Sequence, residues 1–468
     1  MLNHIGINYG RQGDNLPSPY RSIESIKSMK AGIVKLYDAD PETLKLLAGT
    51  SLRVSVMVQN SEIFSIASNE SIAKQWVHDN ILAYYPQTMI RYIMVGNEVY
   101  GNQTLSQWKS LVLAMQHVKN CLRNHNIHNI KIGSPMAMNV MSLSFPPSNG
   151  TFQAESLSTV VPLLQFLNKT SSFFFLNVYP YFPWAKNPDD ISLNFTLFKG
   201  GNLSYIDPGS GFVYTNLLDQ MLDSVHFAMA KLGFPSIPIA ISETGWPNDG
   251  DLDQPGANIH NAATYNRNLI HKMVADPPLG TPARPGVIIP TFLFSLYNEN
   301  LKIGPGTERH WGLLHPSGSP LYSIDLTGNR SLFEPLPKPQ NDRAYEGKLW
   351  CVLARFANIS GLGPVLSDMC RRLNGTCEAA LGPGKDCYEP VSLTWHASYA
   401  FSAYWAKFRE SGEPCYFNGL ASLTTTDPSK CLDFLKKIFP SNFLCTPIDI
   451  NSHCLYVYVF YACVYHTL

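Results

Sequence analysis

The feature that most constrains the fold is an alternation of short apolar runs with longer helical stretches over roughly the first 330 residues. The apolar runs are rich in Val, Ile and Phe, as buried parallel strands are. Eight of them are predicted as strands, at residues 5–10, 32–38, 53–58, 90–98, 130–136, 173–181, 237–246 and 287–299. The clearest helical stretches between them cover residues 70–85, 106–124, 157–168, 216–232 and 258–275. This order predicts an α/β protein with a (β/α)8, or TIM, barrel.

Two of the predicted strands end in a glutamate. Glu98 closes the fourth run and Glu243 closes the seventh. A carboxylate at the end of a buried strand is costly unless it is paired or used in chemistry. The C-terminal strand ends of a barrel form its active-site face, so both carboxylates are expected there. Hydrolysis of a glycosidic bond requires two such carboxylates, and the pair therefore predicts a retaining glycosidase.

The neighbours of the two glutamates divide their roles. Asn97 precedes Glu98 and can hydrogen-bond the 2-hydroxyl of a sugar, a contact that strengthens in the transition state. This favours Glu98 as the acid/base and Glu243 as the nucleophile. A tyrosine hydroxyl near the nucleophile would orient it and lower its pKa. Tyr179, after the sixth strand, is the first candidate for this role, and Tyr37, after the second, is the next.

Further aromatic and charged residues at the strand ends are open to two interpretations. Trp246 can stack on a glucosyl ring or belong to the core. Glu299, Lys302 and Glu308 follow the eighth strand, where they either support substrate binding or form a structural ion-pair network. No metal site and no cofactor is expected.

The charge balance bears on the partner. The net charge is zero at pH 7, and charged residues make up 15% of the chain, against roughly 25% in an average soluble protein. This gives no electrostatic case for nucleic acid or for an anionic membrane surface. We therefore expect a neutral partner. The protein is also expected to be a monomer.

The cysteines lie almost entirely in the last quarter of the chain. Cys121 is followed by nine more, at positions 351, 370, 377, 387, 415, 431, 445, 454 and 463. A dense cluster after a cysteine-poor domain predicts a small disulfide-stapled module in an oxidising compartment. Zinc is the alternative, but no Cys-x-x-Cys pair supports it.

Nine Asn-x-Ser/Thr sequons also favour export and glycosylation. They begin at Asn69, Asn102, Asn149, Asn168, Asn194, Asn202, Asn329, Asn358 and Asn374. No signal peptide is visible before the first predicted strand. The sequence is therefore expected to begin at or inside the mature protein, or to come from a truncated gene model.

These features divide the chain into four parts. A barrel is predicted over residues 1–331 and a linker over 332–349, where prolines at alternate positions favour an extended spacer. The cysteine-rich module is predicted over 350–435, and an apolar or irregular tail over 436–468. The apolar run within the tail, residues 454–464, is too short to cross a membrane. The tail is either a degenerate GPI-anchor signal or a non-native end from mis-splicing. Within the barrel, the connection 186–211 is predicted to be a loop over the catalytic face.

A series of motifs at the strand ends resembles plant glycoside hydrolase family 17, the 1,3-β-glucanases. The motifs are IGINYG at 5–10, VKLYD at 34–38, VGNE at 95–98, NVYPY at 177–181, SETGWP at 242–247 and ENLK at 299–302. Gln59-Asn60 departs from the family's Pro-Asn after the third strand. The resemblance implies endo-hydrolysis of 1,3-β-glucan with retention, with Glu243 as nucleophile and Glu98 as acid/base. It also implies supporting roles for Glu299, Lys302 and Glu308.

The cysteine-rich module resembles the family 43 carbohydrate-binding module, or X8 domain. The similar segments are WC at 350–351, ASYAF at 397–401, CYF at 415–417 and TTTDP at 424–428, together with the cysteines. Six cysteines permit 15 pairings, and the family pattern implies Cys351–Cys415, Cys370–Cys377 and Cys387–Cys431. It also implies binding to 1,3-β-glucan. Cys445, Cys454 and Cys463 are left without an assigned partner.

The sequence thus predicts a secreted plant endo-1,3-β-glucanase with an appended glucan-binding module. Its expected substrate is callose-like glucan, in the cell wall or at the outer face of the plasma membrane. A glucan transglycosylase would use the same two glutamates and pass the glycosyl group to a sugar. A non-catalytic wall protein that binds glucan is the alternative from another class, and the presence of both glutamates disfavours it.

Overall fold

The computed structural model describes residues 3–427, except for 330–333, 340, 344, 356, 376, 378–380, 386–387 and 389–390. The chain divides into two compact units, Met1–Ala344 and Tyr345–Leu468. The division falls inside the segment predicted as a linker. Each unit is described by itself below.

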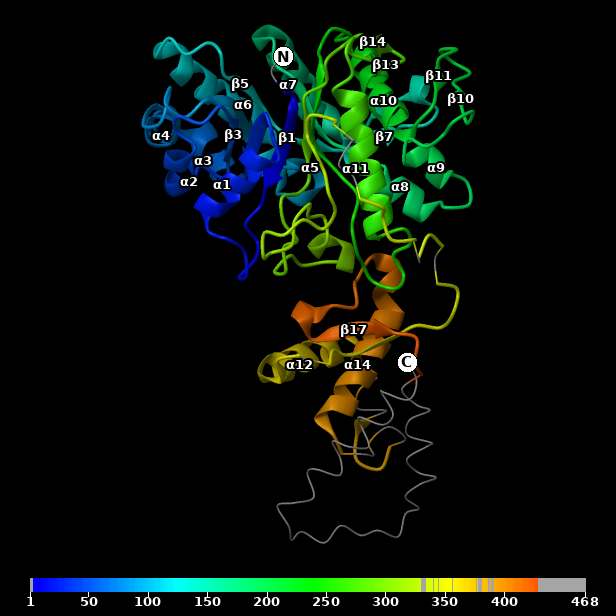
Figure 1. Cartoon of the computed structure of the whole chain (residues 1–468). Helices are drawn as coiled ribbons and strands as arrows, with labels where there is room; N and C mark the ends of the chain where they lie inside the picture. Colours follow the sequence, from blue (N-terminus) through cyan, green and yellow to red (C-terminus); the bar gives the residue numbers. More distant parts are fainter. Residues whose placement is uncertain are drawn as a thin grey trace. The chain divides into compact units, whose positions relative to one another are not determined.

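The first unit is built around a ring of parallel strands (Figure 1). Their spatial order is β5-β4-β3-β2-β1-β15-β12-β9-β6. Only Ser134 and Pro135 separate β5 from β6, so the pairings of β5 with β4 and of β6 with β9 close the ring. The bounds are β1 Ile5–Tyr9, β2 Ile33–Leu36, β3 Arg53–Val58, β4 Ile90–Val95, β5 Lys131–Gly133, β6 Met136–Ala137, β9 Phe174–Asn177, β12 Ile239–Thr244 and β15 Thr291–Leu293. The predicted (β/α)8 barrel is therefore confirmed.

Helices follow the strands and cover the outer side of the ring (Figure 1). The five predicted stretches correspond to α4 Glu70–Val77, α6 Leu105–Asn124, α7 Leu157–Thr170, α10 Leu217–Lys231 and α11 Ile259–Met273. Several shorter helices were not predicted, among them α1 Pro19–Ser28, α2 Pro41–Leu46 and α3 Ile63–Ser68. These three are short, with six to ten residues each, and so offer few turns over which a helical pattern can be recognised. In α1, for example, the buried apolar side chains are Ile23 and Ile26.

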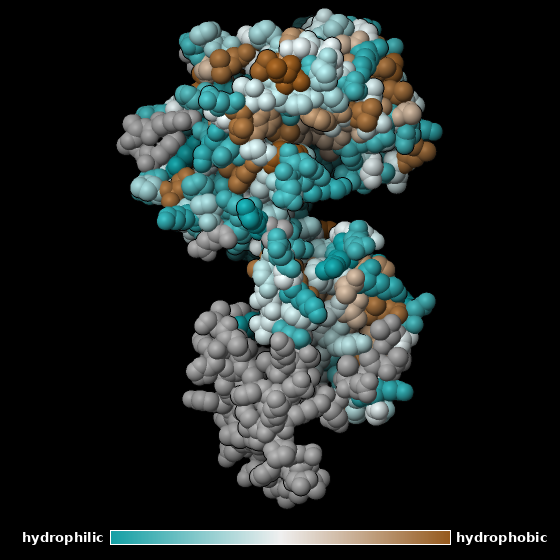
Figure 2. Space-filling view, turned by 90° about the vertical axis from the view of Figure 1, so that its right-hand side faces the viewer, coloured by the Kyte–Doolittle hydropathy of each residue, from teal (hydrophilic) through white to brown (hydrophobic). Residues whose placement is uncertain are grey.

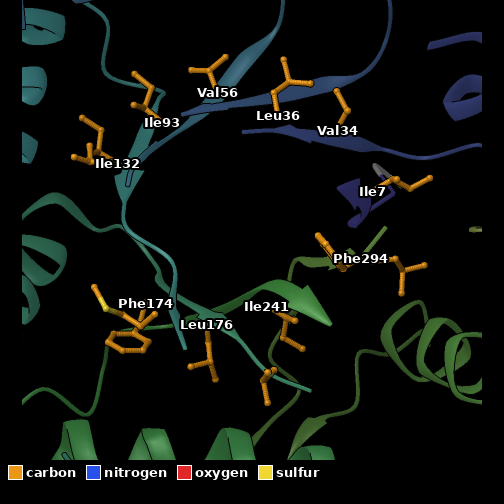
Figure 3. Close-up of a cluster of buried hydrophobic side chains, with 14 of the residues drawn as sticks. Ile7, Val34, Leu36, Val56, Ile93, Ile132, Phe174, Leu176, Ile241 and Phe294 are labelled. Atoms are coloured by element: carbon orange, nitrogen blue, oxygen red, sulfur yellow. The ribbon is translucent and has the colours of Figure 1, made fainter. Parts of the chain in front are cut away.

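The side chains of the strands alternate between the two sides of the ring. One set, which includes Ile7, Val34, Val56 and Ile93, belongs to the main core together with helix side chains, and Figure 3 shows it around the ring. The other set forms a separate apolar cluster inside the barrel: Ile33, Met57, Tyr92, Met94, Phe175, Ala240 and Phe292. Two residues further along β2, β9 and β12, the same side of the ring carries Lys35, Asn177 and Ser242. A polar layer therefore lies on the apolar interior, toward the C-terminal strand ends.

The end of the connection 186–211 does not lie over the catalytic face, where the whole connection was predicted to lie. It leads into a hairpin of β10 (Tyr205–Ile206) and β11 (Val213–Tyr214), which is placed beside α10 (Figure 1). The ring of Phe212 stacks on that of Phe227 in the second half of α10, with 6.3 Å between centroids. Asp207 fixes the hairpin by accepting hydrogen bonds from the backbone N and the Oγ of Ser148, at 2.8 and 2.7 Å. Because α10 leads to the start of β12, the hairpin lies toward the end of the barrel remote from Glu243.

Among its described residues, the second unit has its own core around two helices and one strand pair. β16 (Trp350–Leu353) pairs antiparallel with β17 (Ala421–Thr424), and the helices are α12 Leu362–Arg372 and α14 Leu393–Phe408. The buried residues of α14 recur at helical spacing, namely Ala397, Ala400, Phe401, Tyr404 and Trp405. This unit therefore has a hydrophobic core of its own.

Two disulfides bind the second unit together. Cys351 bonds Cys415 at 2.07 Å, and Cys370 bonds Cys377 at 2.03 Å. Both pairs are those that the resemblance implied. The implied Cys387–Cys431 pair lies outside the described residues, and so do Cys445, Cys454, Cys463 and the tail 436–468.

The surface of the first unit mixes polar and apolar residues. Figure 2 shows hydrophobic residues scattered among hydrophilic ones on the face it presents. Scattered apolar residues are normal on a folded surface and need no partner. Within the described ranges, no helix combines the length and the apolar character needed to cross a bilayer.

Candidate active site

Glu243 faces the barrel interior because β12 contains a bulge. Along the pairing with β9, Ile241 lies opposite Leu176 and Glu243 lies opposite Asn177, so residues 242 and 243 together face one partner. Neighbouring side chains of a regular strand point to opposite sides, whereas a bulge redirects one of them. Ser242 also faces inward, since its Oγ donates a hydrogen bond to Asn177 Oδ1 at 2.6 Å.

Three donors hold the Glu243 carboxylate. Lys35 Nζ donates to Oε1 at 2.8 Å, the Tyr37 hydroxyl donates to the same oxygen at 2.6 Å, and the Tyr179 hydroxyl donates to Oε2 at 2.8 Å. Burial by itself would raise the pKa of Glu243. The Lys35 charge and then the hydrogen bonds outweigh burial and hold the pKa of Glu243 below its usual value. Glu243 is therefore an ionised carboxylate aimed into the site.

Lys35 was not predicted as a site residue. It lies in β2, whose four residues are all buried, and its side chain has no exposed surface. A buried ammonium needs a charge partner, and Glu243 supplies it. The signal that could have identified it is a lysine inside an apolar strand, two residues before Tyr37 and so on the same side of the sheet.

Glu98 lies just beyond β4 in a tightly held turn. Its backbone is left-handed, with φ 48° and ψ 48°, which costs a residue other than glycine roughly 1–3 kcal/mol. Two hydrogen bonds made by the Asn60 side chain hold Asn97, the residue before Glu98. Asn60 Oδ1 accepts from Asn97 N at 2.7 Å, and Asn60 Nδ2 donates to Asn97 O at 3.0 Å. The backbone N–H of Glu98 donates to Pro135 O at 3.0 Å. Asn60 thus fixes this turn although Gln59 stands where the related family has proline.

The environment of Glu98 favours its protonated form. Burial, followed by the negative charge of Glu243, raises the pKa of Glu98 above its usual value. Two influences oppose this shift: a hydrogen bond from Asn177 Nδ2 to Glu98 Oε1 at 2.8 Å, and the positive charge of Lys35. Asn177 therefore links Glu98 to Ser242, the residue next to Glu243. Two carboxyl groups with oppositely shifted pKa values meet the requirement for an acid and a nucleophile in one site.

The other residues predicted near the nucleophile lie beside the pair. Tyr37 and Tyr179 both contact Glu243, as described above. Asn97 is half-buried, and its Oδ1 accepts a hydrogen bond from Asn177 Nδ2 at 3.4 Å. Its contact with a sugar 2-hydroxyl remains a prediction.

Trp246 has no ring face open to a sugar. It is fully buried, its Nε1 donates to Gly256 O at 2.8 Å, and its ring packs against Tyr181 and Tyr265. The structure therefore assigns Trp246 to the core, the other role that the sequence left open. The aromatic side chain exposed beside the site is instead Phe182, which is 46% exposed and whose ring lies 5.7 Å from that of Tyr179. Sequence reasoning missed Phe182 because burial of neighbouring aromatics cannot be read from a short run.

The charged set after β15 forms a loose network. Lys302 Nζ lies 3.9 Å from Glu299 Oε2 and 4.0 Å from Glu308 Oε2. Glu299 also accepts from Gln12 N at 2.7 Å. Burial raises the pKa of both glutamates, against the positive charge of Lys302. Within the described part of the chain, none of the three hydrogen-bonds Glu98 or Glu243, so this geometry agrees with the ion-pair interpretation.

The arrangement can perform acid-assisted displacement at a sugar. A carboxylate whose pKa is lowered, Glu243, and a carboxyl group whose pKa is raised, Glu98, lie at the C-terminal strand ends, where barrel enzymes carry their active sites. The carboxylate can attack an anomeric carbon while the other group protonates the departing oxygen.

Comparisons with known proteins agree with this geometry. Residues 5–326 match the family model of glycosyl hydrolases family 17, and residues 349–422 match that of the X8 domain. The chain is 59% identical to "Probable glucan endo-1,3-beta-glucosidase A6" of Arabidopsis thaliana, over 92% of this chain and 90% of the relative. Among solved structures it is similar to "CJP38, a beta-1,3-glucanase and allergen of Cryptomeria japonica pollen", with 39% identity, a TM-score of 0.66, and coverage of 69% of this chain and 99% of the other. A second solved structure, described as one of two plant beta-glucan endohydrolases with distinct substrate specificities, has 33% identity and a TM-score of 0.63, over 68% and 99% of the two chains.

Proposed function

The chain belongs to glycosyl hydrolases family 17, and from that premise we propose that it hydrolyses internal linkages of 1,3-β-glucan by a retaining double displacement. Glu243 is the nucleophile and Glu98 the acid/base. The observation that carries this assignment is the opposite shift of the two pKa values, downward for Glu243 and upward for Glu98. Lys35 supports the assignment because it is the buried cation that keeps Glu243 ionised.

In the first step, Glu243 attacks the anomeric carbon while Glu98 donates its proton to the leaving oxygen. A glycosyl ester of Glu243 forms, and the leaving sugar departs with the proton. The Tyr37 and Tyr179 hydroxyls hold one carboxylate oxygen each, so they orient the nucleophile.

In the second step, Glu98 takes a proton from water, which attacks the same carbon and releases Glu243. Esterified Glu243 no longer carries a negative charge. The like-charge repulsion that helps to raise the pKa of Glu98 is then absent, so Glu98 ionises more readily and can act as the base. The charge of Glu243 thus influences the pKa of Glu98 in the order that the reaction needs: Glu98 is an acid in the first step and a base in the second.

Product analysis tests this function. Incubation of the purified protein with linear 1,3-β-glucan should release a series of short oligosaccharides, whereas linear 1,4-β-glucan should stay intact. If longer chains formed together with shorter ones and the number of reducing ends did not rise, transfer to a sugar would replace hydrolysis. If no product formed, the result would favour the alternative of a non-catalytic wall protein that binds glucan.

The surface positions of the sequons support export of the protein. All nine sequon asparagines are exposed, whereas most of the other described asparagines are buried or half-buried. Asn69 and Asn358 use Oδ1 to accept from the backbone of Ser71 and Ser360, at 2.9 and 3.2 Å, so their Nδ2 atoms are not needed by the fold. Attachment of a glycan at Nδ2 requires this combination of exposure and an unused nitrogen.

We expect the protein to be glycosylated when it is made in plant cells, and to act in the cell wall or at the outer face of the plasma membrane. Treatment with a peptide N-glycosidase active on plant glycans should increase its electrophoretic mobility. An unchanged mobility would remove this support for export. A GPI-type anchor in the tail and a monomeric state remain predictions from the sequence.

A further inference from the structure

Ser242 carries a hydroxyl group that none of the steps above uses. The residue is fully buried in β12, and its Oγ donates to Asn177 Oδ1 at 2.6 Å. Asn177, the last residue of β9, is also buried, and its Nδ2 donates to Glu98 Oε1 at 2.8 Å. Two hydrogen bonds in series therefore connect the residue beside the nucleophile to the acid/base.

The amide of Asn177 could take two orientations, which exchange its oxygen and its nitrogen. In the structure the nitrogen faces two oxygens, Glu98 Oε1 and Asn97 Oδ1, and the oxygen faces the Ser242 hydroxyl. If the amide turned over, Ser242 Oγ would accept from the nitrogen, and its own proton would lack an acceptor. Asn177 is the only hydrogen-bond partner of this hydroxyl among the described residues. Because a buried donor without a partner is costly, the Ser242 hydroxyl selects the orientation that the structure has.

The orientation of Asn177 decides which oxygen of Glu98 carries the proton. An amide NH2 group can only donate, so Glu98 Oε1 must accept. The carbonyl oxygen of a protonated carboxyl group is the better acceptor, which places the proton on Oε2. Within the described part of the chain Oε2 has no hydrogen-bond partner, and Glu98 is only half-buried. The proton therefore lies on the oxygen that a leaving group can reach.

We propose that Ser242 is a positioning residue, which acts through Asn177 to keep the proton of Glu98 available to the leaving oxygen. This rests on the proposed function, in which Glu98 is the acid of the first step. With the amide turned over, the Glu98 hydroxyl would donate to Asn177 Oδ1, and the proton would have to leave that bond before it reached the sugar. The amide oxygen would also lie against the Glu98 carboxylate of the second step.

The charged groups around Glu98 do not depend on Ser242. They come from three elements, namely Glu243 from β12, Lys35 from β2 and Glu308 from the 3-10 helix Gly306–Arg309. After burial, the two negative charges raise the pKa of Glu98, whereas the bond from Asn177 and the charge of Lys35 lower it. Ser242→Ala leaves all three charges in place. A further rise in the pKa of Glu98 in this variant would therefore report the lost bond from Asn177.

The leaving group of the substrate tests the proposal in Ser242→Ala. On linear 1,3-β-glucan, whose leaving sugar needs the proton, kcat/KM should fall about tenfold, less than the roughly 10²–10⁴-fold contribution of a whole general acid. The fall of kcat/KM at high pH, where Glu98 ionises, should move to higher pH. Phenol release from a 1,3-β-oligoglucoside of an acidic phenol needs no proton, so its kcat/KM should stay close to that of the parent. Ser242 adjoins Glu243, and equal losses on both substrates would mean a displaced nucleophile and would overturn the proposal.

Ser55→Ala is the matched control, because this hydroxyl is buried in β3 and has no hydrogen-bond partner among the described residues. It should keep the parent's rates on both substrates. Asn177→Ala removes the bond to Glu98 directly and should show the same dependence on the leaving group as Ser242→Ala. Because Ser242 acts through Asn177, the double variant should be no slower on glucan than Asn177→Ala alone. Losses that multiply in the double variant would contradict the proposal.

Glu98→Gln separates the role of Ser242 from the proposed function. If Glu98→Gln lost activity equally on both substrates, Glu98 would not be the acid, and both the function assignment and the role of Ser242 would fail. If Glu98→Gln depended on the leaving group and Ser242→Ala did not, only the role of Ser242 would be wrong.

Discussion

Glu243→Gln is expected to lower kcat on 1,3-β-glucan by about 10⁴-fold or more. The amide nearly matches the carboxylate in size; its oxygen can still accept from one of the Tyr37 and Tyr179 hydroxyls, and its NH2 can donate to the other. It cannot form the glycosyl ester, however, so the first step is lost. Release of reducing ends measures the effect, and circular dichroism checks that the barrel is folded. Near-native activity would contradict the assignment of the nucleophile.

Glu98→Gln is the matched comparison, since it makes the same chemical change on the other carboxyl group. Loss of a general acid typically costs about 10²–10⁴-fold. A substrate with an acidic phenol as leaving group needs no proton in the first step, so its cleavage to the glycosyl enzyme should remain fast in Glu98→Gln. The same substrate should not rescue Glu243→Gln. Rescue of Glu243→Gln in place of Glu98→Gln would reverse the two roles.

Lys35→Met is expected to give the largest loss of stability of any single change in the site. It leaves the Glu243 carboxylate buried without its cation, and breaking a buried pair from one side typically costs about 3–5 kcal/mol. In the parent protein, the lowered pKa of Glu243 contributes stability at neutral pH. This contribution fades as the pH falls through that pKa. Without Lys35, burial should raise the pKa of Glu243 instead. The loss should therefore be greatest near neutral pH and smaller in acid, where Glu243 becomes protonated; urea unfolding at both pH values measures it.

The double variant Lys35→Met/Glu243→Gln separates the charge effect from simple packing. It removes both charges, so it should be more stable at neutral pH than Lys35→Met alone. Active Lys35→Met enzyme should also lose activity at a higher pH than the parent as the solution is acidified, because Glu243 protonates earlier. If Lys35→Met unfolded at the parent's urea concentration at neutral pH, the account of how Glu243 is kept ionised would be wrong.

The barrel could be predicted because its strands are short apolar runs, several of which end in a chemically distinctive residue. Glu98 and Glu243 stood out for the same reason, as carboxylates at the ends of buried runs. Lys35 did not stand out, although it is the residue on which the charge of Glu243 depends. Its role follows from a contact across the barrel to β12, 208 positions away in sequence, and only the closed ring brings the two together.

Local departures from regular strand geometry also could not be predicted from the sequence. The bulge in β12 turns Glu243 inward together with Ser242, and strict alternation would have placed them on opposite sides. Trp246 and Phe182 show the same limit for aromatic residues. Both follow strand ends, yet neighbouring rings bury the first and leave the second exposed. Such differences depend on the packing of neighbouring loops, which residue type alone does not determine.

The anomer released first from linear 1,3-β-glucan is the most direct test of the double displacement. NMR spectra taken in the first minutes of the reaction, before mutarotation, show the configuration of the new reducing ends. Two displacements at the same carbon, through Glu243 and then water, predict β-anomer first and α-anomer only later by mutarotation. Initial release of α-anomer would mean a single displacement by water and would contradict the role of Glu243 as nucleophile.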